Sequence, residues 1–234
     1  MSDKIVNWGA ALPKEYQSRS LGDIKALHIK KLIRGVILAP SGAGKTNLVF
    51  HILKSSPNVF THLHLVARNP DQELYDYIRD KLEGFITVYD PQSPPSVDSI
   101  EADPKGGVQL VIIDDYSSNK ALQKHLFSHY FIRGRHKRLS TLFLSHSWFA
   151  LDKMIRLNSE YLFLMKANSI RDLRMILADF TIPSVTLEQL QRACEQATKE
   201  KGQFLLIDDP NSQLRFNFNH VITNSATLET KKLN

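Results

Sequence analysis

Short apolar runs alternate with amphipathic stretches through most of the chain. A continuous apolar run bounded by turn residues is typical of a strand buried on both faces of a parallel sheet, whereas apolar residues three and four positions apart are typical of a helix. The pattern predicts strands at 33–39, 61–66, 85–89, 108–113, 141–145 and 160–165. It predicts helices at 45–54, 71–82, 119–132 and 169–179, with shorter candidates at 21–27 and just before Pro104. This alternation indicates an α/β fold with right-handed crossovers and a mainly parallel sheet flanked by helices.

The pattern changes toward the end of the chain. An amphipathic helix is predicted at 186–201, and two β-like runs at 203–207 and 214–218 form a hairpin around a turn at 208–212. A chain of 234 residues is long enough for one well-buried α/β core with an appendage. We therefore expect an N-terminal arm at 1–28, a core at 29–183, and an appended C-terminal helix and hairpin at 184–234.

A glycine-rich loop, Ala-Pro-Ser-Gly-Ala-Gly-Lys-Thr, joins the first predicted core strand to the helix after it. Gly42 and Gly44 allow the loop to curl so that its backbone N–H groups point at a polyphosphate. Lys45 is expected to reach the β- and γ-phosphates of ATP and Thr46 to coordinate Mg²⁺. Ala39 stands where this motif, the Walker A motif, usually has glycine. The residues predicted to contact the nucleotide are Ala39, Pro40, Ser41, Gly42, Ala43, Gly44, Lys45, Thr46 and Asn47.

Two acids follow a buried apolar strand, as nucleotide hydrolysis requires. Asp114 is predicted to hold the metal, and Asp115 to orient and deprotonate the attacking water, as in a Walker B motif. Asp208 and Asp209 also follow an apolar run, but Pro210 comes next and a second β-like run returns. That second pair is therefore predicted to solvate a hairpin turn.

Positive charge is concentrated in one segment of the chain. The net charge is +6 and the isoelectric point about 9.3, which favours an anionic partner. No Asp or Glu occurs between Tyr116 and Leu151, where lysines, arginines and four histidines gather. Around Gly134 this segment reads Arg133-Gly-Arg135-His-Lys-Arg138. Its arginines are candidates for an arginine finger, for a lid over the phosphates, for a grip on nucleic-acid phosphates, or for a solvated basic face.

The next predicted strand ends in His146, which is a candidate sensor of the γ-phosphate. The single cysteine, Cys194, falls on the apolar side of a helical pattern and is predicted to be a core residue. No apolar stretch approaches the length of a membrane span, and the first residues lack a signal segment. We therefore expect a protein of the cytoplasm.

Four motifs, in their order and spacing over about residues 30–180, resemble the poxvirus-type DNA-packaging ATPases of large double-stranded DNA viruses, in the FtsK/HerA superfamily. Two are the phosphate loop and the strand ending in Asp114-Asp115. The other two are Gly134-Arg135-His136 leading into Ser140, and Met154-Ile155-Arg156-Leu157-Asn158. The resemblance implies a RecA-like P-loop core that assembles into a homo-oligomeric ring, pentameric or hexameric, and drives double-stranded DNA into a preformed capsid. Capsid proteins are then further partners, and the infected cytoplasm or the virion is the location.

Carried over by position, the resemblance makes Lys45 and Thr46 ligands of nucleotide and Mg²⁺, and makes Arg135 or Arg133 the finger that acts on a neighbouring subunit. His146 departs from the glutamine that the family usually has. Arg156 and Asn158 match the family's Arg-x-Asn element, with an intersubunit or strand-capping role.

Three functions are compatible with these residues. An oligomeric, ATP-hydrolysing DNA motor is predicted first, from the complete nucleotide site beside a basic segment. A P-loop kinase acting on a nucleotide or a nucleic-acid end is the second, with Arg133 to Arg138 as its mobile lid. A nucleotide-binding scaffold without turnover is the third, favoured by the departures at Ala39 and His146.

Overall fold

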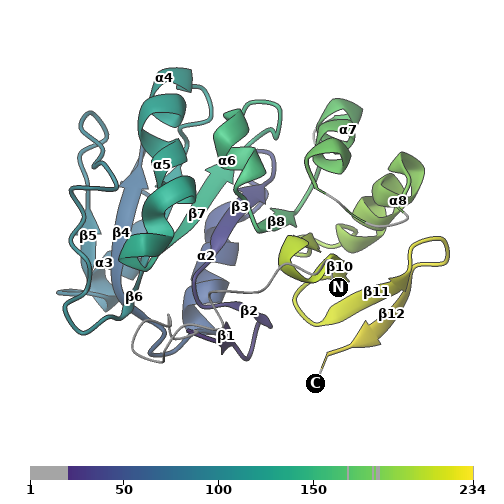
Figure 1. The fold of residues 1–234 in the computed structure, drawn as a ribbon, viewed down its shortest axis with the longest axis horizontal. Coiled ribbons are helices and arrows are strands. Elements are labelled where there is room, and N and C mark those ends of the chain that lie inside the picture. Colours follow the sequence, from purple (N-terminus) through teal and green to yellow (C-terminus); the bar gives the residue numbers. More distant parts are fainter. Residues whose placement is uncertain (1–20, 168, 181, 183–184, 234) are drawn as a thin grey trace, which may run out of the picture.

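Ten strands within the described part of the chain form one sheet that runs through the whole molecule (Figure 1). The computed structural model describes residues 21–167, 169–180, 182 and 185–233. The strand order is β12-β11-β10-β9-β8-β3-β7-β6-β4-β5. The parallel strands are β3 (Arg34–Leu38), β4 (Phe60–Ala67), β5 (Ile86–Val88), β6 (Val108–Asp114), β7 (Leu139–Ser145) and β8 (Tyr161–Leu164). The antiparallel strands are β9 (Leu205–Asp208), β10 (Gln213–Phe216), β11 (His220–Asn224) and β12 (Glu229–Lys232).

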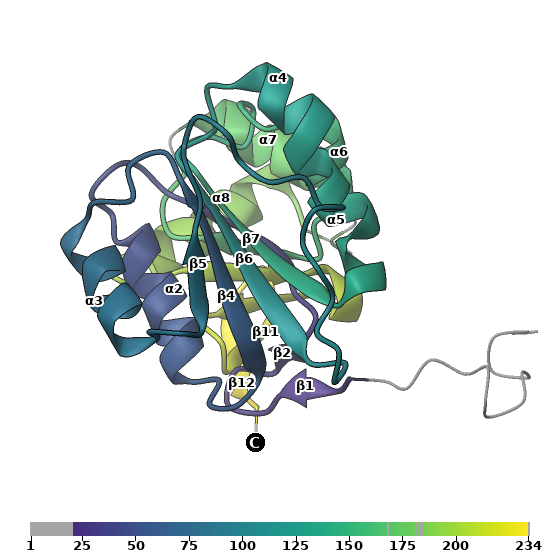
Figure 2. The ribbon, with the colours of Figure 1, turned by 90° about the vertical axis from the view of Figure 1, so that its left-hand side faces the viewer.

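Helices cover both faces of the sheet (Figure 2). One face is covered by α2 (Lys45–Lys54) and α3 (Glu73–Lys81). The other face is covered by α4 (Lys120–Leu122), η1 (Gln123–Phe127), α5 (Ser128–Arg133), α6 (Lys153–Leu157), α7 (Ile170–Asp179) and α8 (Leu187–Ala197). Successive residues of a strand point to opposite faces, so Val36 and Leu38 pack in one core cluster and Ile37 in the other. Burial on both faces explains why these strands are continuous apolar runs in the sequence.

The predicted hairpin is not separate from the sheet. β9 pairs antiparallel with β8, and β10 returns along β9, so the hairpin extends the sheet beyond its parallel part. β11 and β12, which the sequence pattern did not predict, form a second hairpin beyond β10 at the end of the strand order. Cys194 lies buried in α8, as predicted, and burial raises the pKa of its thiol. The predicted segment boundary at 183–184 and most of the predicted N-terminal arm lie outside the described residues.

Two short helices that the sequence pattern suggested are absent from the described residues. Instead of a helix at 21–27, β1 (Asp23–Ile24) and β2 (Ile29–Lys30) form a small hairpin. Gly22, within the predicted range, has a φ of 70°, which a right-handed helix cannot contain, and His28 just after it has a φ of 50° in the turn between the two strands. The segment before Pro104 forms turns rather than a helix. The predicted helix at 119–132 exists, but a π-helical stretch, η1, interrupts it.

Because β3, β4, β6, β7 and β8 are parallel, their carboxyl ends lie along one edge of the sheet and their amino ends along the opposite edge. We call these the carboxyl edge and the amino edge. In open α/β sheets, ligands bind outside the carboxyl ends of the strands. No helix in the described residues is long and apolar enough to cross a membrane.

Candidate nucleotide site

The glycine-rich loop leaves β3 at the carboxyl edge and leads directly into α2. Gly42 and Gly44 have φ of 72° and 94°, in the left-handed region that side chains with a Cβ rarely adopt. Gly44 is the N-cap of α2 and offers no side chain to the first turn, so the helix start keeps N–H groups for an anion. Ala39 is fully buried at the end of the strand, where its small side chain fits.

Lys45 folds back over this loop. Its Nζ donates to the carbonyl oxygens of Ala39, at 3.0 Å, and Pro40, at 3.2 Å. Nζ also lies 3.1 Å from Nδ1 of His146. Burial lowers the pKa of Lys45, and the nearby charges of Asp114 and Asp115 oppose that effect. The ammonium group is thus held among acceptors, next to the space where a phosphate would lie.

Asp114 closes β6 and is buried, with only 7% of its surface exposed. The hydroxyl of Tyr75, on α3, donates to its Oδ2 at 2.8 Å. The side chain of Thr46 also interacts with the Tyr75 hydroxyl, and this interaction opposes the rise that burial causes in the pKa of Tyr75. Burial raises the pKa of Asp114, while the bond from Tyr75 and the charge of Lys45 lower it. Tyr75 therefore lies beside both of the residues predicted to hold Mg²⁺.

Asp115 faces outward from the same edge. Its φ of 64° turns the backbone, so its side chain is 41% exposed while that of Asp114 is buried. Asn69, just after β4, donates from Nδ2 to Asp115 Oδ2 at 3.2 Å. His146 Nε2 lies 3.4 Å from Asp115 Oδ1. His146 therefore bridges Lys45 and Asp115. The two neighbouring acids thus differ in environment, since Asp114 is buried and Asp115 is partly exposed.

A cavity of about 570 Å³ lies between these side chains. It is lined by Ser41, Gly42, Gly44, Lys45, Thr46, Asn47, Asn69, Gln72, Glu73, Leu74, Asp114, Asp115 and His146. Lys45 is the one lysine or arginine among these residues. No group of three or more His, Cys, Asp or Glu in the described residues is arranged to hold a metal. One carboxylate and one hydroxyl do fit Mg²⁺, which takes oxygen ligands and is completed by substrate phosphates.

The basic segment lies at the opposite edge. It forms the end of α5 and η2 (Gly134–Lys137), which precede the amino end of β7. Arg133 donates to Asp98 at 3.0 Å, and Lys137 Nζ donates to the carbonyl oxygens of Asp98 and Ile100, at 2.7 Å each. Seven strand residues span roughly 20 Å. These arginines are therefore too far away to form a lid over the phosphates of the same chain, and the predicted alternative of a kinase lid is wrong.

The second acid pair lies in the predicted hairpin turn, but the prediction that both acids are solvated is wrong for Asp208, because only Asp209 is exposed. Asp208 is fully buried, forms an ion pair with Arg215, and accepts a hydrogen bond from the backbone N–H of Asn211 in η3 (Asp209–Asn211). Asp208 therefore shapes the turn between β9 and β10.

The Arg-x-Asn element makes contacts within its own chain. Arg156 Nε donates to Asp179 Oδ2 at 2.7 Å, and the indole of Trp148 donates to the same oxygen at 2.8 Å. Asn158 Nδ2 donates to the carbonyl oxygen of Met154 at 2.8 Å, which closes helix α6. The expected strand-capping role is therefore wrong, because Asn158 caps a helix.

Three residues around the site escaped the sequence analysis. Tyr75 fits the apolar stripe of α3 and gives no sign of its bond to Asp114. Asp172, buried in α7, accepts hydrogen bonds from Ser147 and Phe149 and so holds the loop after β7. Gln123 is fully buried and donates to three carbonyl oxygens, including that of Ala150 in the same loop.

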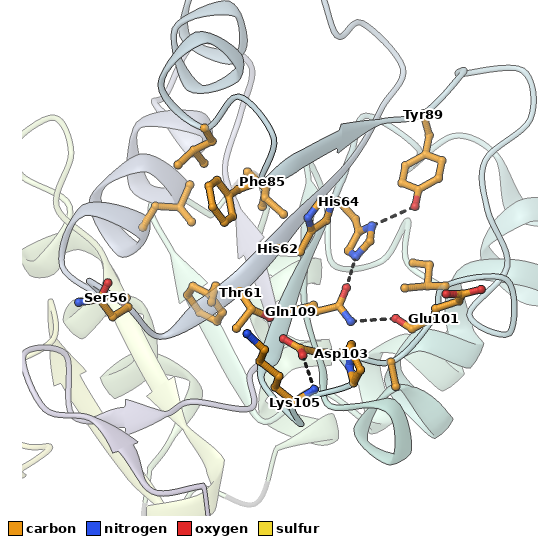
Figure 3. A pocket seen from close by; sticks show the side chains of 18 of the residues that line it. Ser56, Thr61, His62, His64, Phe85, Tyr89, Glu101, Asp103, Lys105 and Gln109 are labelled. Atoms are coloured by element: carbon orange, nitrogen blue, oxygen red, sulfur yellow. Dashed lines mark hydrogen bonds between the residues drawn. The ribbon is translucent and has the colours of Figure 1, made fainter.

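A larger cavity, of about 1030 Å³, lies toward the amino ends of β4 and β6 (Figure 3). His64 is already paired on both ring nitrogens, with the hydroxyl of Tyr89 at 2.9 Å and the side-chain oxygen of Gln109 at 2.6 Å. Gln109 continues the chain of bonds to the carbonyl oxygen of Glu101. These polar groups stabilise one another, and no glycine-rich loop lies among the described residues that line this cavity, so it is not the nucleotide site.

No protein-family model and no curated protein matches the sequence. Solved structures do match in shape. The genome packaging NTPase B204 from Sulfolobus turreted icosahedral virus 2 in complex with AMP aligns with a TM-score of 0.56 and 14% identity, over 81% of this chain and 98% of that one. Its complex with ATP-gammaS aligns at 0.55 and 15%, over 80% and 97%. A structure of B204, the DNA-packaging ATPase from Sulfolobus Turreted Icosahedral Virus, aligns with a TM-score of 0.57 and 13% identity, over 80% of this chain and 98% of that one. The chain therefore has the α/β, RecA-like fold of a viral genome-packaging NTPase.

Proposed function

We propose that this protein is a Mg²⁺-dependent ATPase that works as a motor on double-stranded DNA and packages a viral genome into a preformed capsid. The observation that carries the proposal is the convergence of Lys45, Asp114 and Asp115 on one cavity, from the phosphate loop after β3 and from the carboxyl end of β6. A phosphate loop next to a buried and an exposed carboxylate provides what hydrolysis of a nucleoside triphosphate requires. The B204 structures support this reading, since they carry AMP, AMPPCP or ATP-gammaS in a protein described as a packaging NTPase.

Each residue has a distinct role in this site. The loop N–H groups and Lys45 bind the β- and γ-phosphates, and Lys45 leaves the carbonyl oxygens of Ala39 and Pro40 to do so. Thr46 and Asp114 would hold Mg²⁺, which supplies charge neutralisation between the phosphates. Asp115, exposed to solvent, accepts the proton of the attacking water. His146 contacts both Lys45 and Asp115 and so senses whether the γ-phosphate is present.

The site contains no arginine among its described lining residues. Arginine stabilises the charge that spreads over the transferred phosphoryl group. Arg135 is exposed at the amino edge, about the length of a strand away from its own phosphates. We infer that Arg135, or Arg133 beside it, serves the site of a neighbouring copy in a homo-oligomeric ring, while the other basic side chains of that edge face DNA.

The direct test measures ATP hydrolysis by the purified protein with and without duplex DNA, at low and high salt, together with the mass of the assembly. We expect turnover, stimulation by DNA that weakens steeply as salt rises, and a mass of several chains. Lys45→Ala should abolish turnover, whereas Lys54→Ala, an exposed lysine on the same helix, should not. Binding of ATP without multiple turnover would instead support a scaffold, and a phosphorylated acceptor with little free phosphate would support a kinase. Fractionation of infected cells and virions would show where the protein is located.

A further inference from the structure

A second cavity adjoins the nucleotide cavity on the other side of the phosphate loop. Its volume is about 620 Å³, and the two cavities share Gly44 and Asn47. Gly44 lies between the two cavities. A Cβ at this position would lie 3.7 Å from Nδ2 of Asn47 and 3.8 Å from the methyl carbon of Met165. The second cavity is lined by Ala43, Gly44, Asn47, Leu48, His51, Met165, Lys201, Gly202, Gln203, Phe204, Asn217, Phe218, Asn219 and His220.

The floor of this cavity is apolar and aromatic. Met165, Phe204 and Phe218 are each at most 5% exposed, yet all three line the cavity. Phe218 packs edge-on against Phe204, with ring centroids 5.0 Å apart. The Phe218 ring also stacks with the ring of His51, with centroids 5.8 Å apart and an interplanar angle of 20°. His51 is exposed at the rim, so a flat ring system is available at the entrance of the cavity.

The rim is polar and carries an unused acceptor. Asn219 Oδ1 is buried and has no hydrogen-bond partner among the described residues. A buried carbonyl oxygen without a donor costs free energy that a ligand N–H or O–H would recover. Asn217 differs, because its Oδ1 already accepts from the backbone N–H of Phe204 at 3.1 Å.

We propose that this second cavity binds the base and ribose of the nucleotide whose phosphates lie on the loop. The inference rests on the proposed ATPase function and extends it. A nucleoside triphosphate places a charged chain at one end and a flat, largely uncharged ring at the other. The phosphate cavity is lined almost entirely by polar residues and glycines, with Leu74 as its one large apolar residue among those described. The adjoining cavity supplies the apolar floor and polar edge that a base requires.

The assignment gives the end of the chain a place in the nucleotide site. Lys201, Gln203 and Phe204 precede β9, and Phe218 and Asn219 precede β11. These residues reach the phosphate loop because β9 pairs with β8, which lies next to β3. The C-terminal strands thus provide the wall against which the base packs.

The test compares the binding of two ligands by calorimetry, both with Mg²⁺: ATP, and inorganic tripolyphosphate, which has the phosphates without base or ribose. The wild-type protein should bind ATP more tightly than tripolyphosphate. His51→Ala removes a stacking partner and should weaken ATP binding about two- to tenfold, while tripolyphosphate binding stays the same. Asn219→Leu should act in the same direction. His125→Ala, an exposed histidine on η1, should change neither affinity.

Unchanged tripolyphosphate binding shows in each variant that the phosphate loop is still folded. If both His51→Ala and Asn219→Leu bind ATP as wild type does, or if the wild type binds the two ligands equally, the second cavity does not hold the base. The ATPase proposal would survive either result. If the wild type binds neither ligand, the proposed function itself is wrong.

Discussion

The two edges of the parallel sheet use charge in opposite ways. At the carboxyl edge, Lys45 and Asp114 are buried, and both influence each other's pKa. At the amino edge, Arg133 and Arg138 are exposed, with Arg133 paired to the exposed Asp98 and Arg138 bonded to the carbonyl oxygen of Gly106. One edge holds few charges in a fixed arrangement, and the other displays many charges to solvent.

The difference indicates a division of labour. Buried charges interact strongly and are oriented before a substrate arrives, which suits catalysis. Exposed charges interact weakly with one another but create a field that attracts a large anion and is screened by salt. We therefore propose that catalysis takes place at the carboxyl edge and that the amino edge contacts DNA, and the experiments below test this division.

The largest effect is expected where the two edges meet, because Arg135 at the amino edge of one copy would complete the site at the carboxyl edge of another. Arg135→Ala should lower the turnover of the assembled protein by about 10³ to 10⁵, the range found for arginine fingers. Asp115→Asn should also be inactive. Mixing the two inactive proteins should restore hydrolysis, because some interfaces then pair an intact Arg135 with an intact Asp115.

Lys124→Ala, an exposed lysine on η1, is the matched control for Arg135→Ala and should keep full turnover. Activity is followed by phosphate release, and assembly of the mixture is checked by its mass. A mixture that assembles but stays inactive would mean that Arg135 does not act between subunits.

A smaller effect is expected at Tyr75, within the carboxyl edge. Tyr75→Phe keeps the ring but removes the hydroxyl that donates to Asp114 and interacts with Thr46. Hydrogen bonds to charged groups contribute about 1.5 to 3 kcal/mol, so turnover should fall roughly tenfold or more. The Mg²⁺ concentration needed for half-maximal turnover should rise, which a purely structural role would not cause. Tyr77→Phe, on the exposed side of the same helix, should leave both quantities unchanged.

Tyr75 also shows where sequence analysis of this chain reaches its limit. The loop of Gly42 and Gly44 could be found because its chemistry follows from consecutive residues. The strands could be found because burial on both faces writes a continuous apolar run. The bond between Tyr75 and Asp114 joins residues 39 positions apart, and an aromatic residue on the apolar stripe of a helix gives no sign that its hydroxyl is used.

The position of the basic segment, Arg133 to Arg138, could not be predicted from the sequence for a related reason. In sequence, Arg133 to Arg138 follow the acid pair closely, which suggested a lid above the phosphates. The chain between Asp115 and Leu139 crosses from the carboxyl edge back to the amino edge, as every right-handed crossover in a parallel sheet must. Closeness along the chain therefore means separation in space here. The hairpin at β1 and β2 escaped as well, because a residue with positive φ such as His28 is not marked by its type.

At the amino edge, loss of one charge should weaken DNA binding moderately. Arg138→Gln removes one positive charge, so the slope of the logarithm of DNA affinity against the logarithm of salt concentration should fall by about 0.9. Arg138→Lys keeps the charge and should keep the slope. Hydrolysis without DNA should be the same in both variants. An unchanged slope in Arg138→Gln, measured by fluorescence anisotropy on labelled duplex DNA, would remove this side chain from the DNA surface.

The smallest effect concerns stability at the amino edge. Burial lowers the pKa of His64 below its ordinary value, and burial does the same to its neighbour His62. The unfolded chain then binds more protons than the folded one below about pH 6.5, so the free energy of unfolding should decrease as the pH falls from 7 to 5. One proton contributes at most about 1.4 kcal/mol per pH unit. Urea unfolding across this range should show a shallower decrease in His64→Gln and an unchanged one in His125→Ala, because His125 is exposed. If the free energy of unfolding falls equally with pH in all three proteins, protonation of His64 does not destabilise the fold.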